Sequence, residues 1–243
     1  MQTTTTRSTY TTRSQSTREW VKNSPHPLAS LLRRVFFAVR HWQCPEIPVV
    51  HSLIYRIHQT ISSLVSSLLR IFYWTPLFSS KCVSKPKRLY LYSGMPQILG
   101  NIEISVGDSS RISGLSTFTG RTTASAPSLS IGSNVDIGWQ TTIAVGTQVI
   151  ISDNVRIAGQ CFLAGYPGHP MNPLDRANGK PDTDDQAGPV VLQKNVWLAS
   201  GVSVMPNVVI GENTVVAAGS IVTKSLPANV LAAGIPAKVI RSL

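Results

Sequence analysis

The feature that most constrains this chain is a repeat of six residues near its C-terminal end. Aliphatic residues recur there without a miss, at Leu192, Leu198, Val204, Ile210, Val216 and Val222. An earlier block has the same period at Ile131, Ile137 and Ile143, slips by two residues, and resumes at Ile151, Ile157 and Leu163. An α-helix repeats every ~3.6 residues and a flat strand every ~2, so neither explains the spacing. Self-similarity with this period predicts a β-solenoid built of short strands and corners.

The corners of such a solenoid need unusual backbone dihedral angles, and the repeat contains a residue suited to them. In five repeats an asparagine stands directly before a second, mostly small, inward-facing position; these are Asn134, Asn154, Asn195, Asn207 and Asn213. Asparagine adopts the left-handed region more readily than most non-glycine residues. A repeated asparagine therefore predicts a repeated corner, and the fold class of this part is all-β.

Charge divides the chain into two dissimilar parts. The sequence holds 22 Lys and Arg residues against 11 Asp and Glu residues, a net charge of +11. Up to residue 100 there are 13 basic residues and 2 acidic ones, whereas the rest of the chain has 9 of each. We expect four segments: a disordered basic Ser/Thr-rich tail over 1–26, a basic amphipathic helical region over 27–97, the β-helix over 98–228 with a loop excursion over 164–191, and a C-terminal segment over 229–243.

Two helices, each with one apolar face, are predicted within residues 27–97. The apolar face of the first contains Leu28, Leu31, Leu32, Val35, Phe36 and Val39, and that of the second contains Val50, Ile54, Ile57, Ile61, Leu64, Leu68 and Phe72. Such faces pack on each other, on a partner subunit or on a membrane surface, and these alternatives stay open. Basic residues on the polar sides make residues 27–88 a candidate for peripheral contact with an anionic membrane.

Several classes of location and partner are disfavoured by what the sequence lacks. No apolar stretch runs 18 residues without a charge or a strong polar interruption, so we expect no spanning helix and no secretory signal. Cys44, Cys82 and Cys161 form no CxxC pair, which favours a reducing compartment. We therefore expect a cytoplasmic protein, at most peripheral to the inner face of the cytoplasmic membrane. The basic residues form no motif that reads nucleic acid, so no nucleic-acid partner is expected.

The six-residue phase breaks between Leu163 and Leu192, where the chain makes a long polar excursion. Excursions on a rigid scaffold are where functional residues usually lie. His169 lies in this segment and is the only histidine after His58. A lone loop histidine is a candidate proton acceptor, although most such histidines are merely solvated.

Four stretches of the sequence closely resemble the hexapeptide-repeat acyltransferases. They are GHP at 168–170, NVWLASG at 195–201, AAGSIVTK at 217–224 and AAGIPAKVIRSL at 232–243. The likeness is to the maltose and galactoside O-acetyltransferase branch and to its relatives from bacterial surface-polysaccharide loci. It implies a left-handed parallel β-helix with three hexapeptides per coil, assembled as a homotrimer with active sites between subunits. The left hand rests on the resemblance alone, because general crossover rules favour the right hand.

The resemblance also implies a reaction, in which an acetyl group passes from acetyl-CoA to a hydroxyl of a sugar. His169 matches the family's catalytic histidine and would act as the general base. The backbone N–H of Ser200 would stabilise the oxyanion. By the same carry-over, the coenzyme would be bound by Trp197, Ala218, Thr223, Lys224, Lys238 and Arg241. No metal is expected.

The acceptor side is where the chain departs from the sugar acetyltransferases. The stretch IGWQTTIAVG, residues 137–146, lacks the Asn and Asp residues that would contact a sugar there, and Trp139 and Gln140 are the candidates to replace them. The ring of Trp139 suits the apolar face of a pyranose or packing at a subunit seam, and both alternatives stay open. Tyr166 and Asp175, in the excursion, are further candidates for substrate contact. The departure argues against free maltose or galactoside and favours an envelope or surface polysaccharide, or its glycolipid precursor.

Three other functions are alternatives to this one. A carbonic anhydrase on the same scaffold needs three zinc-binding histidines, and residues 101–243 hold one. A serine-type acetyltransferase remains open, because that group also has helices before its β-helix. The alternative from another class is a catalytically silent trimeric scaffold that binds a membrane or a partner through its helices.

Overall fold

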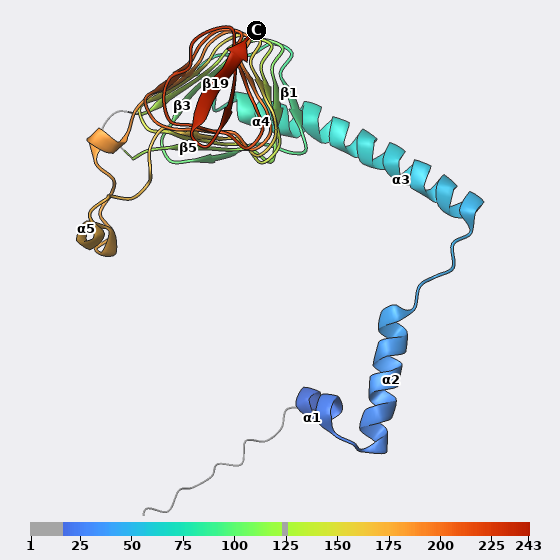
Figure 1. Ribbon diagram of the computed structural model, residues 1–243. Coiled ribbons are helices and arrows are strands. Elements are labelled where there is room, and N and C mark those ends of the chain that lie inside the picture. Colours follow the sequence, from blue (N-terminus) through green and yellow to red (C-terminus); the bar gives the residue numbers. More distant parts are fainter. Residues whose placement is uncertain (1–16, 123–125) are drawn as a thin grey trace, which may run out of the picture. The chain divides into compact units, whose positions relative to one another are not determined.

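The structure, a computed structural model, describes residues 17–122 and 126–243. Most of the predicted tail therefore lies outside the described residues, and its last part forms helix α1 (Thr17–Asn23). The chain divides into two compact units, Met1–Ile57 and His58–Leu243. The first is helical, and the second contains a three-sided stack of strands (Figure 1).

The first unit is built around helix α2 (Pro27–His41). Pro27 occupies its first turn, and the His26 ring accepts a hydrogen bond from the Leu28 amide, so the N-terminus is capped. The Arg33 guanidinium donates to the carbonyl of Val21 at 2.6 Å and to that of Ser24 at 3.0 Å. These bonds hold the end of α1 against α2.

A long helical run follows and leads into the second unit. It comprises α3 (Pro48–Leu69), the π-helical turn η1 (Arg70–Trp74) and α4 (Thr75–Ser79). The run Pro48–Ser79 is 32 residues long and, by length and composition only, is apolar enough to cross a membrane. The sequence predicts an amphipathic helix here but no spanning one, because charged and polar residues interrupt the apolar stretch. The helical run is longer than predicted and includes both Arg56 and Arg70.

In the part of the chain that the structure describes, nineteen strands form three sheets. All but the last two enter the first, second and third sheets in turn, and the last two both join the first sheet. The first sheet contains β1 (Tyr90–Tyr92), β4 (Arg111–Ser113), β7 (Asp136–Ile137), β10 (Arg156–Ile157), β13 (Trp197–Leu198), β16 (Val215–Val216), β18 (Val230–Gly234) and β19 (Ala237–Ser242). The second contains β2 (Gln97–Leu99), β5 (Thr117–Gly120), β8 (Thr142–Val145), β11 (Phe162–Ala164), β14 (Ser203–Val204) and β17 (Ile221–Val222). The third contains β3 (Glu103–Val106), β6 (Ser128–Ile131), β9 (Gln148–Ile151), β12 (Val190–Leu192) and β15 (Val208–Ile210). The result is a parallel β-helix, which begins at Tyr90 rather than at residue 98.

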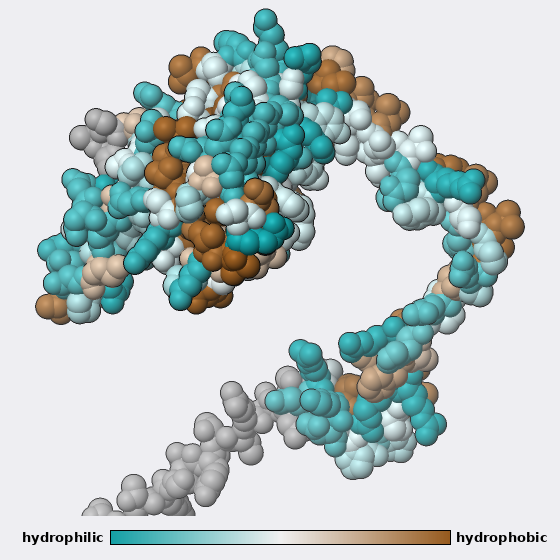
Figure 2. Space-filling model, turned by 45° about the horizontal axis from the view of Figure 1, so that its top comes forward, coloured by the Kyte–Doolittle hydropathy of each residue, from teal (hydrophilic) through white to brown (hydrophobic). Residues whose placement is uncertain are grey.

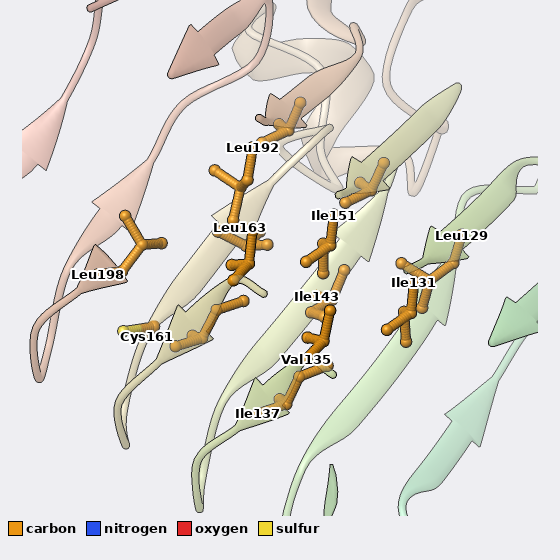
Figure 3. Packing of buried hydrophobic residues seen from close by; sticks show 14 of the residues in the cluster. Leu129, Ile131, Val135, Ile137, Ile143, Ile151, Cys161, Leu163, Leu192 and Leu198 are labelled. Atoms are coloured by element: carbon orange, nitrogen blue, oxygen red, sulfur yellow. The ribbon is translucent and has the colours of Figure 1, made fainter. Parts of the chain in front are cut away.

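The residues of the six-residue repeat form the core of this β-helix. In the first sheet, Ile137 pairs with Ile157, Ile157 with Leu198, and Leu198 with Val216, so one aliphatic column runs along the prism. These side chains are fully or almost fully buried. Figure 3 shows core residues from all three sheets pointing into the shared interior. The register confirms the solenoid predicted from the sequence.

The asparagines lie at the corners, as predicted. All five have a positive φ, between 54° and 63°. Four of them stack along one corner, and the side-chain amides of Asn134, Asn154, Asn195 and Asn213 form a hydrogen-bonded ladder with steps of 2.8 to 3.0 Å. Asn207 turns a different corner. The asparagine thus adopts the strained dihedral and also satisfies polar groups on the neighbouring coil.

Helix α4 closes the first coil of the prism. Phe78 is fully buried, and its ring meets that of Phe118 at 6.3 Å in an edge-on arrangement. The guanidinium of Arg70 lies 4.5 Å from the ring centroid of Tyr90 on β1. An open solenoid end would expose apolar core residues, and these contacts cover it.

Candidate active site

The excursion leaves the prism after β11 and returns to it at β12. Its two ends are joined by a hydrogen bond from the Gly188 amide to the Gly165 carbonyl, at 2.9 Å. Between them the loop carries the short helix α5 (Pro173–Ala177), capped by Asn172, and the 3-10 turn η2 (Asp184–Gln186). The loop extends outward from the prism (Figure 1).

A buried arginine at the end of β5 anchors this loop. The Arg121 Nε donates to Asp182 Oδ1 at 2.6 Å, and Nη2 donates to the Asp182 carbonyl at 2.9 Å. Arg121 also contacts Asp184 Oδ1 at 2.6 Å. Arg121 and Asp182 are each only 7% exposed. The carboxylates raise the pKa of Arg121, Asp182 contributing most, so the guanidinium stays charged within the pair.

The same carboxylate holds the turn that carries His169. Asp182 Oδ2 accepts a hydrogen bond from the Gly168 amide at 3.0 Å. Gly168 has a φ of +79°, a conformation that favours glycine. A second tie joins Tyr166 Oη to Thr119 Oγ1 at 3.0 Å. His169 itself is exposed, and its backbone is fixed by groups that come from β5.

A cavity of about 680 Å³ lies beneath the loop. Tyr166 and Asp175, two of the predicted substrate residues, both line it. The remaining lining residues are Phe162, Ala164, Pro167, Pro170, Met171, Asn172, Thr183, Asp185, Gln186, Met205 and Pro206. His169 is not a lining residue, although Pro167 and Pro170 beside it are. The size suits a small organic ligand.

Ser200 and Ala218 lie together at another corner of the prism, between the first and second sheets. The Gly219 amide donates to the Ser200 carbonyl at 2.9 Å, so the two residues belong to successive coils. Within the described residues, the exposed Ser200 amide has no hydrogen-bond partner. Trp139 is at the same corner, and its ring covers Gly159 so closely that a Cβ there would lie 2.7 Å from it.

The six predicted coenzyme residues do not gather at one place. Trp197 and Arg241 share one row of the first sheet, across Val215 and Leu231, while Lys238 pairs with Ala233 on the terminal hairpin. These residues and Ala218 are near the Ser200 corner. Thr223 and Lys224 instead follow β17, at the corner where the excursion leaves the prism.

One chain therefore presents two separate groups of predicted site residues. The loop corner carries His169, Tyr166, Asp175, Thr223 and Lys224. The other corner carries Ser200, Trp139, Ala218, Trp197, Lys238 and Arg241. Across residues 17–122 and 126–243, no group of three or more His, Cys, Asp or Glu side chains is placed to hold a metal ion.

Arg121 could not be identified as a site residue from the sequence. It lies 61 residues before Asp182, outside any motif, and neither the repeat nor the resemblance marks it. The only available signal was the cluster of aspartates in the excursion, which suggests that a cation is needed nearby.

Comparisons with known proteins agree with this architecture. Residues 189–224 match the family model described as bacterial transferase hexapeptide (six repeats). The galactoside O-acetyltransferase of Escherichia coli (strain K12) is 42% identical over 120 residues, which are 47% of this chain and 57% of that protein. The chain thus spans little more than half the length of this curated relative.

Solved structures show the same fold at lower identity. A mutant of AntD, an N-acyltransferase from Bacillus cereus, in complex with dTDP-4-amino-4,6-dideoxyglucose and coenzyme A, has a TM-score of 0.55 at 24% identity. The match covers 69% of this chain and 87% of that one. AntD in complex with dTDP and 3-hydroxybutyryl-CoA has a TM-score of 0.53 at 22% identity, over 69% of this chain and 86% of that one. The second unit has the left-handed β-helix fold of these structures, and residues 189–224 of it match the hexapeptide model.

Proposed function

We propose that this protein is an acetyl-CoA-dependent O-acetyltransferase. It transfers the acetyl group to a hydroxyl of a sugar in an envelope or surface polysaccharide, or in the glycolipid precursor of one. The observation that carries the proposal is the GHP turn at His169, held by the buried Asp182 on a β-helix of the hexapeptide class. The named activity of the E. coli relative agrees with it. A cytoplasmic location, where acetyl-CoA is made, is part of the proposal.

In the proposed reaction, His169 acts as general base. A sugar hydroxyl is a poor nucleophile at neutral pH, so the neutral imidazole takes its proton as the oxygen attacks the thioester carbonyl. The amide of Ser200, which has no other hydrogen-bond partner in the described part of the chain, donates to the developing oxyanion. The carbon–sulfur bond then breaks, the ester forms, and the histidine returns its proton to the CoA thiolate.

The coenzyme residues have chemistry that fits this use. Lys224, Lys238 and Arg241 are exposed cations, suited to the phosphates of CoA. Trp197 offers a half-exposed ring to the pantetheine arm. Ala218 and Thr223, which lie at different corners of one chain, would contact the coenzyme through their backbones. The apolar cavity beside Tyr166 and Asp175 is the proposed acceptor site.

We further propose that the active site forms between chains of a homotrimer. His169 and the Ser200 amide lie at different corners of one prism, so a substrate that needs both must lie between two copies. The loop corner of one copy and the Ser200 corner of the next would then supply the whole set of residues.

The test is the release of free CoA thiol from acetyl-CoA by the full-length protein. The panel of acceptors contains sugars, sugar nucleotides, amino sugars, serine and envelope glycans, with His169→Ala beside the wild type. We expect acceptor-dependent release that falls by about 100-fold or more in the variant. Because His169 is exposed, the variant should unfold at the same temperature as the wild type. No release with any acceptor, and no thermal shift with acetyl-CoA, would leave the silent scaffold as the better description.

A further inference from the structure

Helix α3 presents an apolar stripe that no part of the described chain covers. Within α3 no residue is buried. Six side chains spaced three or four residues apart lie on one face and are each about half exposed: Val50 46%, Ile54 55%, Ile57 49%, Ile61 56%, Leu64 59% and Leu68 47%. Figure 2 shows hydrophobic residues gathered along one edge of this helix. An exposed stripe of this length indicates an interaction surface.

Helix α2 has the same design with a more basic polar side. Its exposed apolar residues are Leu28, Leu31, Leu32, Val35, Phe36 and Val39, and Arg34 and Arg40 lie away from that stripe. A large aromatic side chain follows each helix: Trp42 comes after α2 and is 73% exposed, and Phe72 comes after α3 and is 76% exposed. Aromatic rings at the edge of an apolar face are typical of helices that lie in a membrane interface.

Along the two helices and the segment that follows them, the charged residues are almost all positive. Between residues 27 and 88 there are nine basic residues, Arg33, Arg34, Arg40, Arg56, Arg70, Lys81, Lys85, Lys87 and Arg88, and one acidic residue, Glu46. After Glu46 the next acidic residue is Glu103. Close to an anionic bilayer each such cation contributes about 1 kcal/mol at physiological ionic strength.

The charged residues also help to decide what covers the apolar stripes: a second copy of the chain, the interior of a membrane, or a membrane surface. If the helices packed on copies of themselves, they would gather like charges, with no acidic residue from 47 to 88 to compensate them. Arg56 and Arg70 are separated by less helix than the ~30 Å thickness of the hydrocarbon. A spanning helix would therefore carry at least one of them, together with the serines of the polar side, into the hydrocarbon, which is costly. A helix that lies on an anionic surface places both faces in suitable surroundings.

We propose that α2 and α3 dock this protein peripherally on the surface of an anionic bilayer, with their apolar stripes at the acyl boundary and their cations among the headgroups. This inference is independent of the proposed acetyltransferase activity. Such docking combines burial of apolar side chains with attraction between the cations and anionic headgroups. Binding of the protein to vesicles must therefore increase with the fraction of anionic lipid and decrease with salt concentration.

The experiment is co-sedimentation of the full-length protein with vesicles of phosphatidylcholine alone or with about one third phosphatidylglycerol, at about 0.05 M and 0.5 M salt. We expect binding to the anionic vesicles that weakens at least tenfold at the higher salt. Binding that is equal on neutral vesicles, or no binding at all, would overturn the proposal. So would binding that resists both salt and alkaline carbonate and needs detergent for release, because that behaviour marks a spanning helix.

A pair of matched variants separates the apolar stripe from charge alone. Ile57→Glu with Leu64→Glu, and Ser63→Glu with Ser66→Glu, add the same two negative charges to the same exposed helix. The first pair should lose vesicle binding at least tenfold more than the second, with circular dichroism unchanged in both. Equal losses would refute docking through the stripe. Cross-linking of wild-type helices to one another without vesicles, abolished only by the first pair, would assign the stripe to a second copy instead.

Discussion

Replacing Asp182 by asparagine should weaken both the fold of the excursion and the proposed reaction. The change is nearly isosteric and leaves an oxygen that can still accept from the Gly168 amide. It removes the charge that faces Arg121 at 2.6 Å, where both side chains are almost fully buried. The guanidinium keeps its hydrogen bond to the backbone carbonyl of residue 182, but among the described residues its one remaining charged partner is Asp184, whose side chain is 96% exposed.

The expected loss of stability follows from the burial of the pair. Removing one partner of a buried ion pair costs about 3–5 kcal/mol, because the remaining charge has lost its compensation. The asparagine retains some hydrogen bonding, so we take about 3 kcal/mol. For a chain of this length each kcal/mol corresponds to about 2–4 °C, which gives a fall in Tm of about 6–12 °C.

The assay is denaturant and thermal unfolding at a fixed protein concentration, applied to Arg121→Gln, Asp182→Asn and the double variant. We expect a coupling free energy of about 1–3 kcal/mol between the two positions. The control is the exposed pair Arg111 and Asp136, which meet at 3.5 Å with side chains 59% and 30% exposed. Neutralising that pair should cost less than about 1 kcal/mol.

Turnover gives a second readout, measured well below the Tm of each variant. If residue 182 no longer fixes the GHP turn, the His169 side chain should move from its position, and small displacements of a catalytic group lower the turnover rate by about 10- to 100-fold. We expect kcat to fall while KM for acetyl-CoA changes little. A coupling energy below about 0.5 kcal/mol, or a variant with the Tm and kcat of the wild type, would refute the anchoring role of this network.

Three further results are expected. Phe78→Ala should cost about 3–5 kcal/mol in unfolding free energy, since the ring fills the end of the first coil; a change under about 1 kcal/mol would mean that α4 does not close the prism. Asn195→Ala should lower the unfolding free energy by about 1–2 kcal/mol, because alanine is strained at a φ of 60° and cannot form the asparagine hydrogen bonds. Asn195→Gly should cost less, because glycine adopts this φ without strain and loses only the hydrogen bonds. A lower denaturant midpoint for the glycine variant than for the alanine variant would refute this account. Burial raises the pKa of the Cys82 thiol from 9.0 to about 11, so the contribution of this thiol to stability is present below pH 9.0 and is lost as the pH rises towards 11. The unfolding free energy of Cys82→Ala should therefore fall less steeply than that of the wild type between pH 9 and 11. At neutral pH, thiol labelling of the native protein should modify the exposed Cys44 and neither of the buried cysteines, Cys82 and Cys161.

The stack of coils was predictable because its physical requirement repeats. Every sixth residue must point into the shared interior, from each of the three sheets in turn, so an aliphatic side chain is needed in each repeat. Successive coils then stack these side chains into columns such as Ile157, Leu198 and Val216. The asparagine corners were predictable for the same reason. The first coil was missed because its residues, around Gly94 and Met95, do not keep the aliphatic spacing, and because its end is covered by Phe78 from a helix.

The site was predictable only in part, because a sequence motif identifies candidate residues but does not show which of them lie close together in the fold. The GHP turn marked His169, yet nothing in the sequence relates it to Arg121, which holds it from a different coil. The separation of His169 from Ser200 was also invisible, because it depends on which corner each residue occupies. The relative positions of these residues depend on how the coils stack, and no local sequence pattern predicts them.

The hydrogen bond between Gly165 and Gly188 has a consequence for how such enzymes diversify. The strands on either side of the excursion stay in register with the neighbouring coils, as Leu163 with Val204 and Leu192 with Ile151. The prism is therefore continuous without the inserted segment, and lengthening a closed loop costs little additional entropy. The inserted segment can therefore vary in sequence and length, and with it the cavity that it lines, while the coils on either side keep the same fold.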